Sequence, residues 1–127
     1  GRNASGQLGD GTTTDRTTPV DVPGLSSGVS AVSAAAAHTC ALLGAGGAMC
    51  WGDNTHGQIG DGTTTNRLTP VSVTGLSAGI MAITAGSMHT CGVSSTGRVE
   101  CWGNNEYGQI GDGTTTNRLT PVGLFCD

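Results

Sequence analysis

"GQIGDGTTTNRLTPV" (Gly57–Val71) decides the fold, because the same fifteen letters return at residues 108–122 and a near copy, "GQLGDGTTTDRTTPV", fills residues 6–20. Successive copies are offset by 51 residues, and the same offset links other residues without a gap. The linked pairs are His38 and His89, Cys40 and Cys91, Cys50 and Cys101, and Trp51 and Trp102. The chain thus holds about two and a half copies of one unit. A period near 50 is typical of β-propeller blades and longer than most helical repeats.

Each unit carries four short segments typical of strands. In the second unit they are "PVSV" (70–73), "GIMAITAG" (79–86), "HTCGVS" (89–94) and "RVECWG" (98–103). The "STG" between the last two favours a hairpin turn. No stretch has a sustained apolar stripe of helical period, so we expect little helix.

These patterns predict an all-β chain built from β-propeller blades of four antiparallel strands. Two blades are complete, part of a third is present, and one chain makes an incomplete ring. The repeated phrase falls between blades. The predicted order is a connection from a preceding repeat (1–18), blade one (19–52), a connection (53–69), blade two (70–103), a connection (104–120) and the start of a truncated third blade (121–127).

Composition narrows the class of partner. The 127 residues include 23 Gly and no Lys, and only 11% are charged, with a formal net charge of −4. An acidic chain offers no electrostatic footprint for nucleic acid, so we expect none as a partner. No apolar run approaches the length of a membrane span, so we expect no membrane insertion.

The segment from His38 to Gly86 resembles the repeat of the regulator of chromosome condensation family. The first part of that family's pattern, "WG-x-N-x-x-G-Q-L-G-x-G", appears from Trp51 and again from Trp102, with isoleucine at the leucine position. The second part, "P-x-x-V", follows at Pro70–Val73. The resemblance covers essentially the whole chain. It implies a propeller, usually of seven four-stranded blades, which two repeats cannot close alone. The paired cysteines resemble those of bacterial, extracellular-looking members more than the nuclear exchange factor.

Four cysteines flank the two predicted hairpin turns. Cys40 and Cys50, like Cys91 and Cys101, would face each other across antiparallel strands, so we predict two disulfides and an extracellular or cell-surface location. Reduced, buried thiols are the alternative. A zinc set of His38, Cys40, Cys50 and His56 is disfavoured, because Tyr107 replaces His56 in the next copy and no C-x-x-C is present. We expect His38 and His89 to bond nearby backbone.

The phrase itself shows little sign of chemistry. Calcium sites usually need several carboxylates, and one Asp per copy is weak support for such a site. A turn in which Asp61 and the neighbouring Thr hydroxyls bond local backbone groups accounts for the segment better. Every notable His, Cys and Asp is duplicated, whereas an active site is normally singular, so we predict no enzyme, no cofactor and no metal. The arginines that recur in each copy would form salt bridges or carbonyl clamps, with the recurring aspartates as candidate partners. An anion ladder is the alternative. These residues are Arg16, Arg67 and Arg118, with Asp10, Asp61 and Asp112.

Residues that differ between copies are candidates for partner contact. They follow the Trp-Gly pair: Asn3, Ala4 and Ser5; Asn54, Thr55 and His56; Asn105, Glu106 and Tyr107. Variable loops on a fixed frame often carry specificity. Neutral drift at exposed sites explains them equally well.

Two blades leave apolar side faces without neighbours, which invites association. The residues expected to line blade packing are Val29, Val32, Leu42, Trp51, Ile80, Ile83, Val93 and Trp102. The chain would be a piece of a longer propeller, close a ring with further copies, or stack into a filament. Cys126, the unpaired fifth cysteine, and Phe125 are candidates for an intermolecular contact.

The favoured function is a structural and protein-interaction module, a propeller segment that self-associates or binds a protein partner. The alternative is a secreted inhibitor or ligand-binding propeller that uses its variable loops. A guanine-nucleotide exchange factor or chromatin binder is disfavoured by the acidity and the cysteine pairs.

Overall fold

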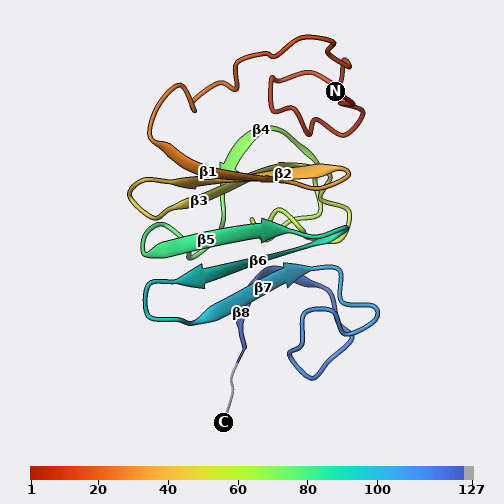
Figure 1. Ribbon diagram of the computed structural model, residues 1–127. Helices are drawn as coiled ribbons and strands as arrows, with labels where there is room; N and C mark the ends of the chain where they lie inside the picture. Colours follow the sequence, from red (N-terminus) through yellow and green to blue (C-terminus); the bar gives the residue numbers. More distant parts are fainter. Residues whose placement is uncertain (125–127) are drawn as a thin grey trace.

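The computed structural model describes residues 1–124 as two antiparallel four-stranded sheets stacked on each other, with no helix among those residues (Figure 1). The first sheet contains β1 (Val29–Ala34), β2 (His38–Leu43), β3 (Ala48–Gly52) and β4 (Arg67–Ser72). The second contains β5 (Ile80–Ala85), β6 (His89–Ser94), β7 (Val99–Gly103) and β8 (Arg118–Gly123). The strands of each sheet lie in chain order. The all-β prediction and the four-stranded blades are confirmed. In residues 1–124 no helix is long and apolar enough to cross a membrane.

One predicted strand assignment is wrong. The segment that starts at Pro70 does not open the second sheet; it lies in β4 and pairs with β3, with Cys50 opposite Val71. Val122 lies likewise opposite Cys101, so β8 completes the second sheet instead of beginning a third blade. A proline marks an edge strand, where its missing N–H does least harm, but it does not say which sheet the edge belongs to. The sheets therefore span 29–72 and 80–123, shifted from the predicted 19–52 and 70–103.

The first residues fold like the connection between β3 and β4. The Arg16 N–H donates to the Gly1 carbonyl at 3.0 Å, and the Gly1 amino group donates to the Arg16 carbonyl. Gly52 and Arg67 are paired residues of β3 and β4, and they stand one repeat later in the sequence. Residues 1–16 thus repeat the form of the connection between the last two strands of a sheet.

The core lies between the two sheets, where β1 and β2 pack on β5. It is one cluster from both sheets and the connections: Cys40, Leu42, Ala48, Cys50, Ile59, Val73, Leu76, Ile80 and Trp102. Val71 and Ile83 pack against it. Of the residues expected to line blade packing, Leu42, Ile80 and Trp102 are buried here. Burial of these side chains is what holds one blade on the next.

Candidate functional site: connections, blade interface and open faces

Each connection is folded around one buried asparagine. The Asn54 amide donates to the carbonyls of Thr63 and Thr65, both at 3.0 Å, while its carbonyl oxygen accepts the Ile59 N–H at 3.0 Å. Its backbone N–H donates to the Asn66 side chain at 2.9 Å. A fully satisfied amide of this kind fixes a loop that has no strand partners of its own.

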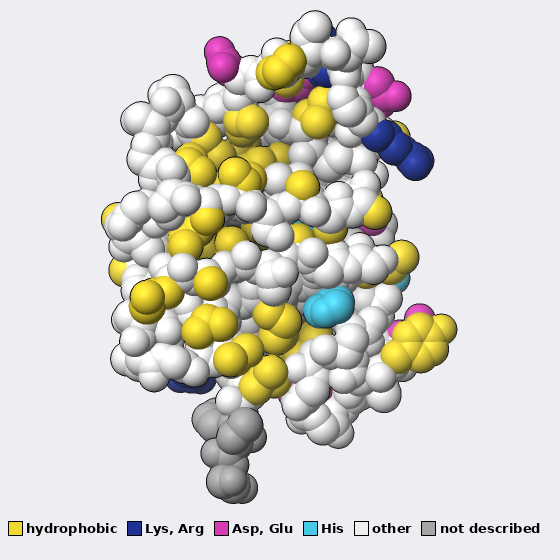
Figure 2. All heavy atoms as spheres, viewed as in Figure 1, with side chains coloured by type: hydrophobic (Ala, Val, Ile, Leu, Met, Phe, Trp, Pro, Cys, Tyr) yellow, Lys and Arg dark blue, Asp and Glu magenta, His cyan; other side chains and the backbone are white. Residues whose placement is uncertain are grey.

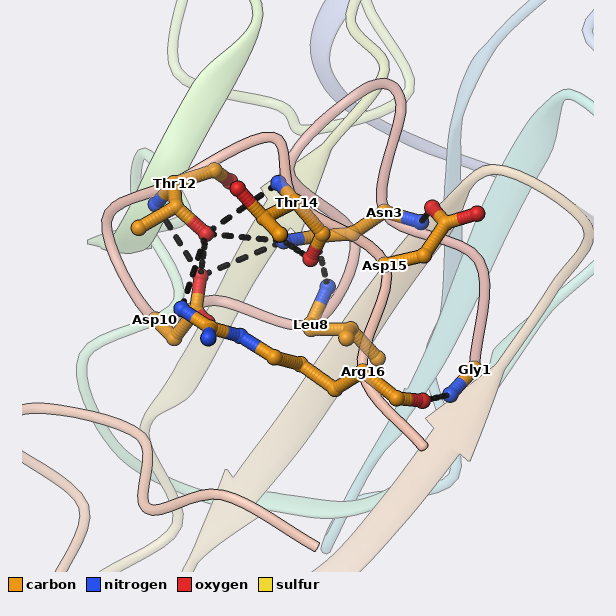
Figure 3. Close-up of polar contacts among 8 residues, drawn as sticks. All are labelled: Gly1, Asn3, Leu8, Asp10, Thr12, Thr14, Asp15 and Arg16. Carbon is orange, nitrogen blue, oxygen red and sulfur yellow. Dashed lines mark hydrogen bonds and ion pairs between the residues drawn. The ribbon is translucent and has the colours of Figure 1, made fainter. Parts of the chain in front are cut away.

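The same hydrogen bonds recur around Asn3 and Asn105, and Figure 3 shows the first copy. All three asparagines are fully buried. Asn54 and Asn105 are therefore not partner-contact side chains, and that part of the loop prediction is wrong. Their identity in all three copies, alongside neighbours that vary, is the signal that marks them as scaffold.

The predicted arginine–aspartate pairs are confirmed in every copy. Arg16 Nε lies 2.8 Å from Asp10, Arg67 Nε 2.7 Å from Asp61, and Arg118 Nε 2.6 Å from Asp112. Hydrogen bonds from the Thr12 hydroxyl, the Thr12 backbone N–H and then the Arg16 guanidinium lower the pKa of the Asp10 carboxyl to about 2. Since each guanidinium is used within its own connection, the three arginines clamp the loops and do not form an anion ladder.

The first two connections also touch the sheet that follows them. The Gln58 carbonyl accepts the Trp102 indole N–H at 3.0 Å and the Thr90 hydroxyl at 2.8 Å. The Gln7 carbonyl takes the equivalent bonds from Trp51 and Thr39. The chain therefore leaves one sheet after β3, binds the next sheet, and returns along β4. Sequence reasoning placed the phrase between blades but missed this double contact, although the Gln and the Thr keep the 51-residue offset.

Gly60 makes that contact close. Its φ is 80°, and a Cβ there would lie 2.6 Å from the Trp102 indole nitrogen. Any side chain at this position would push the connection off the tryptophan.

A buried histidine completes the blade interface. His38 Nε2 lies 2.9 Å from the Thr90 hydroxyl, which itself donates to Gln58, so the histidine is the donor. The expected bond to nearby backbone is therefore wrong for His38: it bonds a side chain of the next blade. Nδ1 has no partner among residues 1–124. Burial lowers the pKa of His38 to about 4, because an imidazolium there would lose its water.

The two cysteine pairs lie where the spacing predicts. Cys40 is directly opposite Cys50 and Cys91 opposite Cys101, with sulfur–sulfur distances of 2.10 and 2.12 Å. The zinc set considered above was His38, Cys40, Cys50 and His56. Its two cysteine sulfurs are paired with each other and His38 is bonded to Thr90, so these side chains are not arranged around a common centre. Cys126 and Phe125 lie outside the described residues.

Sequence models of the regulator of chromosome condensation (RCC1) repeat match residues 1–42, 46–93 and 96–124, and a second RCC1 repeat model matches 29–58 and 81–109. The chain belongs to this family. It is 37% identical over 123 residues to the ultraviolet-B receptor UVR8 of Arabidopsis thaliana. The matched region is 95% of this chain and 28% of the receptor. It is 36% identical over 124 residues to the probable E3 ubiquitin-protein ligase HERC4 of Homo sapiens, covering 95% of this chain and 12% of the ligase.

Solved structures agree on the fold. Human WBSCR16 superposes with a TM-score of 0.82 at 23% identity, over 97% of this chain and 33% of that one. Prp20p of Saccharomyces cerevisiae, whose binding to Gsp1p and histones has been described, superposes with a TM-score of 0.83 at 19% identity. The superposition covers 98% of this chain and 33% of Prp20p. The chain thus spans about a third or less of these relatives, and its two sheets are RCC1 blades of a partial propeller.

Two faces of these RCC1 blades lack a neighbouring sheet. Alternation along β6 turns Thr90 toward the first sheet and Cys91 and Val93 away from it. We call Cys91, Val93 and Val99 the leading face; Val93 is 36% exposed, whereas its equivalent Leu42 is 4% exposed. We call Val29, Val32, Ala41 and Trp51 the trailing face. Val32 is 64% exposed, whereas Ala41 and Trp51 are buried, and Trp51 already lies against Gln7 and Gly9 of the same chain. Figure 2 shows apolar side chains at the surface over both sheets, with few charges among them.

Proposed function

We propose that this chain is a protein-interaction module that acts by binding, and that it associates with blades of its own repeat type, including a second copy of itself. One observation carries this proposal. Each side of the internal blade interface reappears, one repeat away, on a face that has no neighbouring sheet among residues 1–124. The interface inside the chain is thus a template for the contact outside it.

The equivalence can be followed position by position. On the leading side, Val93 corresponds to Leu42 and Val99 to Ala48. On the trailing side, the residues that correspond to Ile80, Ile83, Gly92 and Trp102 are Val29, Val32, Ala41 and Trp51. The Ala41 methyl fits this scheme, because a Cβ at Gly92 would meet its nearest neighbours at ordinary distances of 3.6–3.9 Å. Between the internal interface and the two faces, some positions gain carbon atoms and others lose them, so the total side-chain volume changes little. Packed cores tolerate such volume-conserving changes well.

The N-terminal connection sets a condition on this association. In one copy Trp51 and Thr39 already bond Gln7 of the same chain. A second copy can supply its third connection, residues 104–117, only if it displaces residues 1–16. Because the two phrases are nearly identical, the exchange conserves the hydrogen bonds, as in domain swapping. We therefore propose a head-to-tail contact with exchange of connections.

Gly111 provides the test. A Cβ at Gly111 has no atom within 4 Å in the single chain, but the exchanged arrangement places this glycine against Trp51 of the second copy, as Gly9 and Gly60 lie against Trp51 and Trp102 now. Light scattering coupled to gel filtration, over a series of concentrations, should show association of the parent chain and a monomeric Gly111→Ala variant. Gly9→Ala, which crowds Trp51, should increase association. A parent chain that stays monomeric throughout would refute the proposal.

A ligand-binding propeller that uses the variable loops is the second candidate. Tyr107 favours it, because this aromatic side chain is 84% exposed and aromatic residues are enriched at binding surfaces. Thr55 and Glu106 are also exposed, and His56 is half-buried. For both candidates we propose an extracellular or cell-surface location, which the two cysteine pairs support.

A further inference from the structure

A groove of about 580 Å³ lies between the second and third connections. His56 comes from the second connection and Asn104 and Glu106 from the start of the third, while residues 115–117 and Leu119 close the groove. Leu119 packs over Gly57, whose added Cβ would lie 2.5 Å from the leucine Cδ2. Backbone and side chains of two successive repeats therefore build one depression.

The residues that vary between repeats meet in this groove. His56 replaces Ser5, Asn104 replaces Asp53, and Glu106 replaces Thr55. The leucine and the two threonines of the groove are the same as one repeat earlier, at Leu68, Thr64 and Thr65. A constant frame that gathers three variable side chains from two connections is the arrangement expected of a specificity surface.

The groove does not belong to the blade interface. The equivalent positions one repeat earlier, Thr55 and Leu68, are exposed although the second sheet is packed beside the first. A further blade on the leading face would therefore leave the groove open to a different partner. The surface is independent of the association proposed above.

Charge indicates what the groove binds. Four acidic residues within residues 1–124 are held in ion pairs. They are Asp10, Asp61 and Asp112, which pair with the three clamping arginines, and Glu100, which pairs with Arg98. In the same range Asp15, Asp21, Asp53 and Glu106 remain outside ion pairs. Glu106 alone of these four lines the groove, beside Thr115 and Thr116. The Asn104 and Asn117 side-chain oxygens already accept the backbone N–H groups of Glu106 and Asn105.

We propose that this groove binds a segment of a protein partner that presents an arginine side chain. The Glu106 carboxylate accepts the guanidinium, whose further N–H groups suit the hydroxyls of Thr115 and Thr116, and Leu119, 36% exposed, contacts the aliphatic stem. Tyr107, next along the chain, lines a second depression that shares His56, Asn104 and Glu106 with this groove.

Titration of the ¹⁵N-labelled chain with the tripeptide Ac-Gly-Arg-Gly-NH₂ tests this proposal by NMR, with Ac-Gly-Glu-Gly-NH₂ as the comparison peptide. The arginine peptide should shift the amide resonances of residues 56, 106 and 115–119 in a saturable way, and the glutamate peptide should not. Shifts scattered over the surface, or equal shifts from both peptides, would overturn the proposal.

Two variants with the same charge change separate a specific contact from a diffuse one. Glu106→Gln should weaken binding of the arginine peptide by about tenfold, which is the order expected for one charge-assisted contact. Asp21→Asn, whose residue lies by the trailing face, should leave the affinity unchanged. Equal weakening by both variants would show that only net charge attracts the peptide and would contradict the site. Loss of self-association in Gly111→Ala bears on the other proposal alone.

Discussion

Gly60→Ala tests whether the connection is pressed onto the following blade. Gly60 and Gly111 have nearly the same backbone, with φ of 80° and 81°, so alanine is equally strained at both and should cost roughly 1 kcal/mol at either position. Only Gly60 faces a neighbour: its Cβ would overlap Trp102 Nε1 at 2.6 Å and Val73 Cγ1 at 2.9 Å.

The extra loss at Gly60 can be worked out from these contacts. Overpacking of this kind costs about 1–3 kcal/mol, and displacement of the Trp102 indole from the Gln58 carbonyl removes a hydrogen bond worth about 1 kcal/mol. Gly60→Ala should therefore be less stable than Gly111→Ala by about 2–4 kcal/mol.

Urea unfolding followed by tryptophan fluorescence measures this difference at low protein concentration, where association does not contribute. Near-equal unfolding free energies for Gly60→Ala and Gly111→Ala would refute the reasoning, because the two glycines differ mainly in what they face.

Three further predictions concern the interface, the loops and the cysteines. The folded pKa of His38, about 4, lies below the ordinary 6.5, so the unfolded chain binds the extra proton and stability should fall as pH drops from 6.5 to 4, by roughly 3 kcal/mol in all. His38→Gln should flatten that part of a pH series of urea melts, and His89→Gln, at the half-exposed equivalent, should not. Asn54→Ala should lower the free energy of unfolding by about 2–4 kcal/mol by leaving buried backbone groups unpaired, whereas the exposed Thr64→Ala should change it by less than about 0.5 kcal/mol. Non-reducing peptide mapping should recover Cys40 linked to Cys50; free thiols there would contradict the disulfides and the extracellular location.

The repeat made most of the fold predictable from sequence. A fixed offset of 51 residues identified the unit, and alternation with glycine-bounded turns gave its strands. The cysteine pairing followed from hairpin geometry because it depends only on local register. The Arg–Asp clamp was predictable for a similar reason, since the two side chains are six residues apart in one loop.

Contacts between residues far apart in the sequence were harder to predict. Whether the strand at Pro70 joins the sheet before it or the sheet after it depends on the path of a connection through space, and the local residues suit an edge strand in either case. His38 has the same difficulty, because its partner Thr90 stands in the next repeat. The buried state of Asn54 was readable in principle, since an asparagine kept in all three copies among changing neighbours marks the frame and not the contact surface.

Hydrogen exchange of the tryptophan indole N–H groups tests the central claim most directly, namely that each repeated phrase fastens one blade to the next. Both indole groups are buried and bonded to a glutamine carbonyl of the preceding connection. By NMR, the Trp102 indole proton should exchange as slowly as the amides of β6 and β7, and Gly60→Ala should accelerate it selectively. Rapid exchange of that proton in the parent chain, while the strand amides stay protected, would contradict the claim.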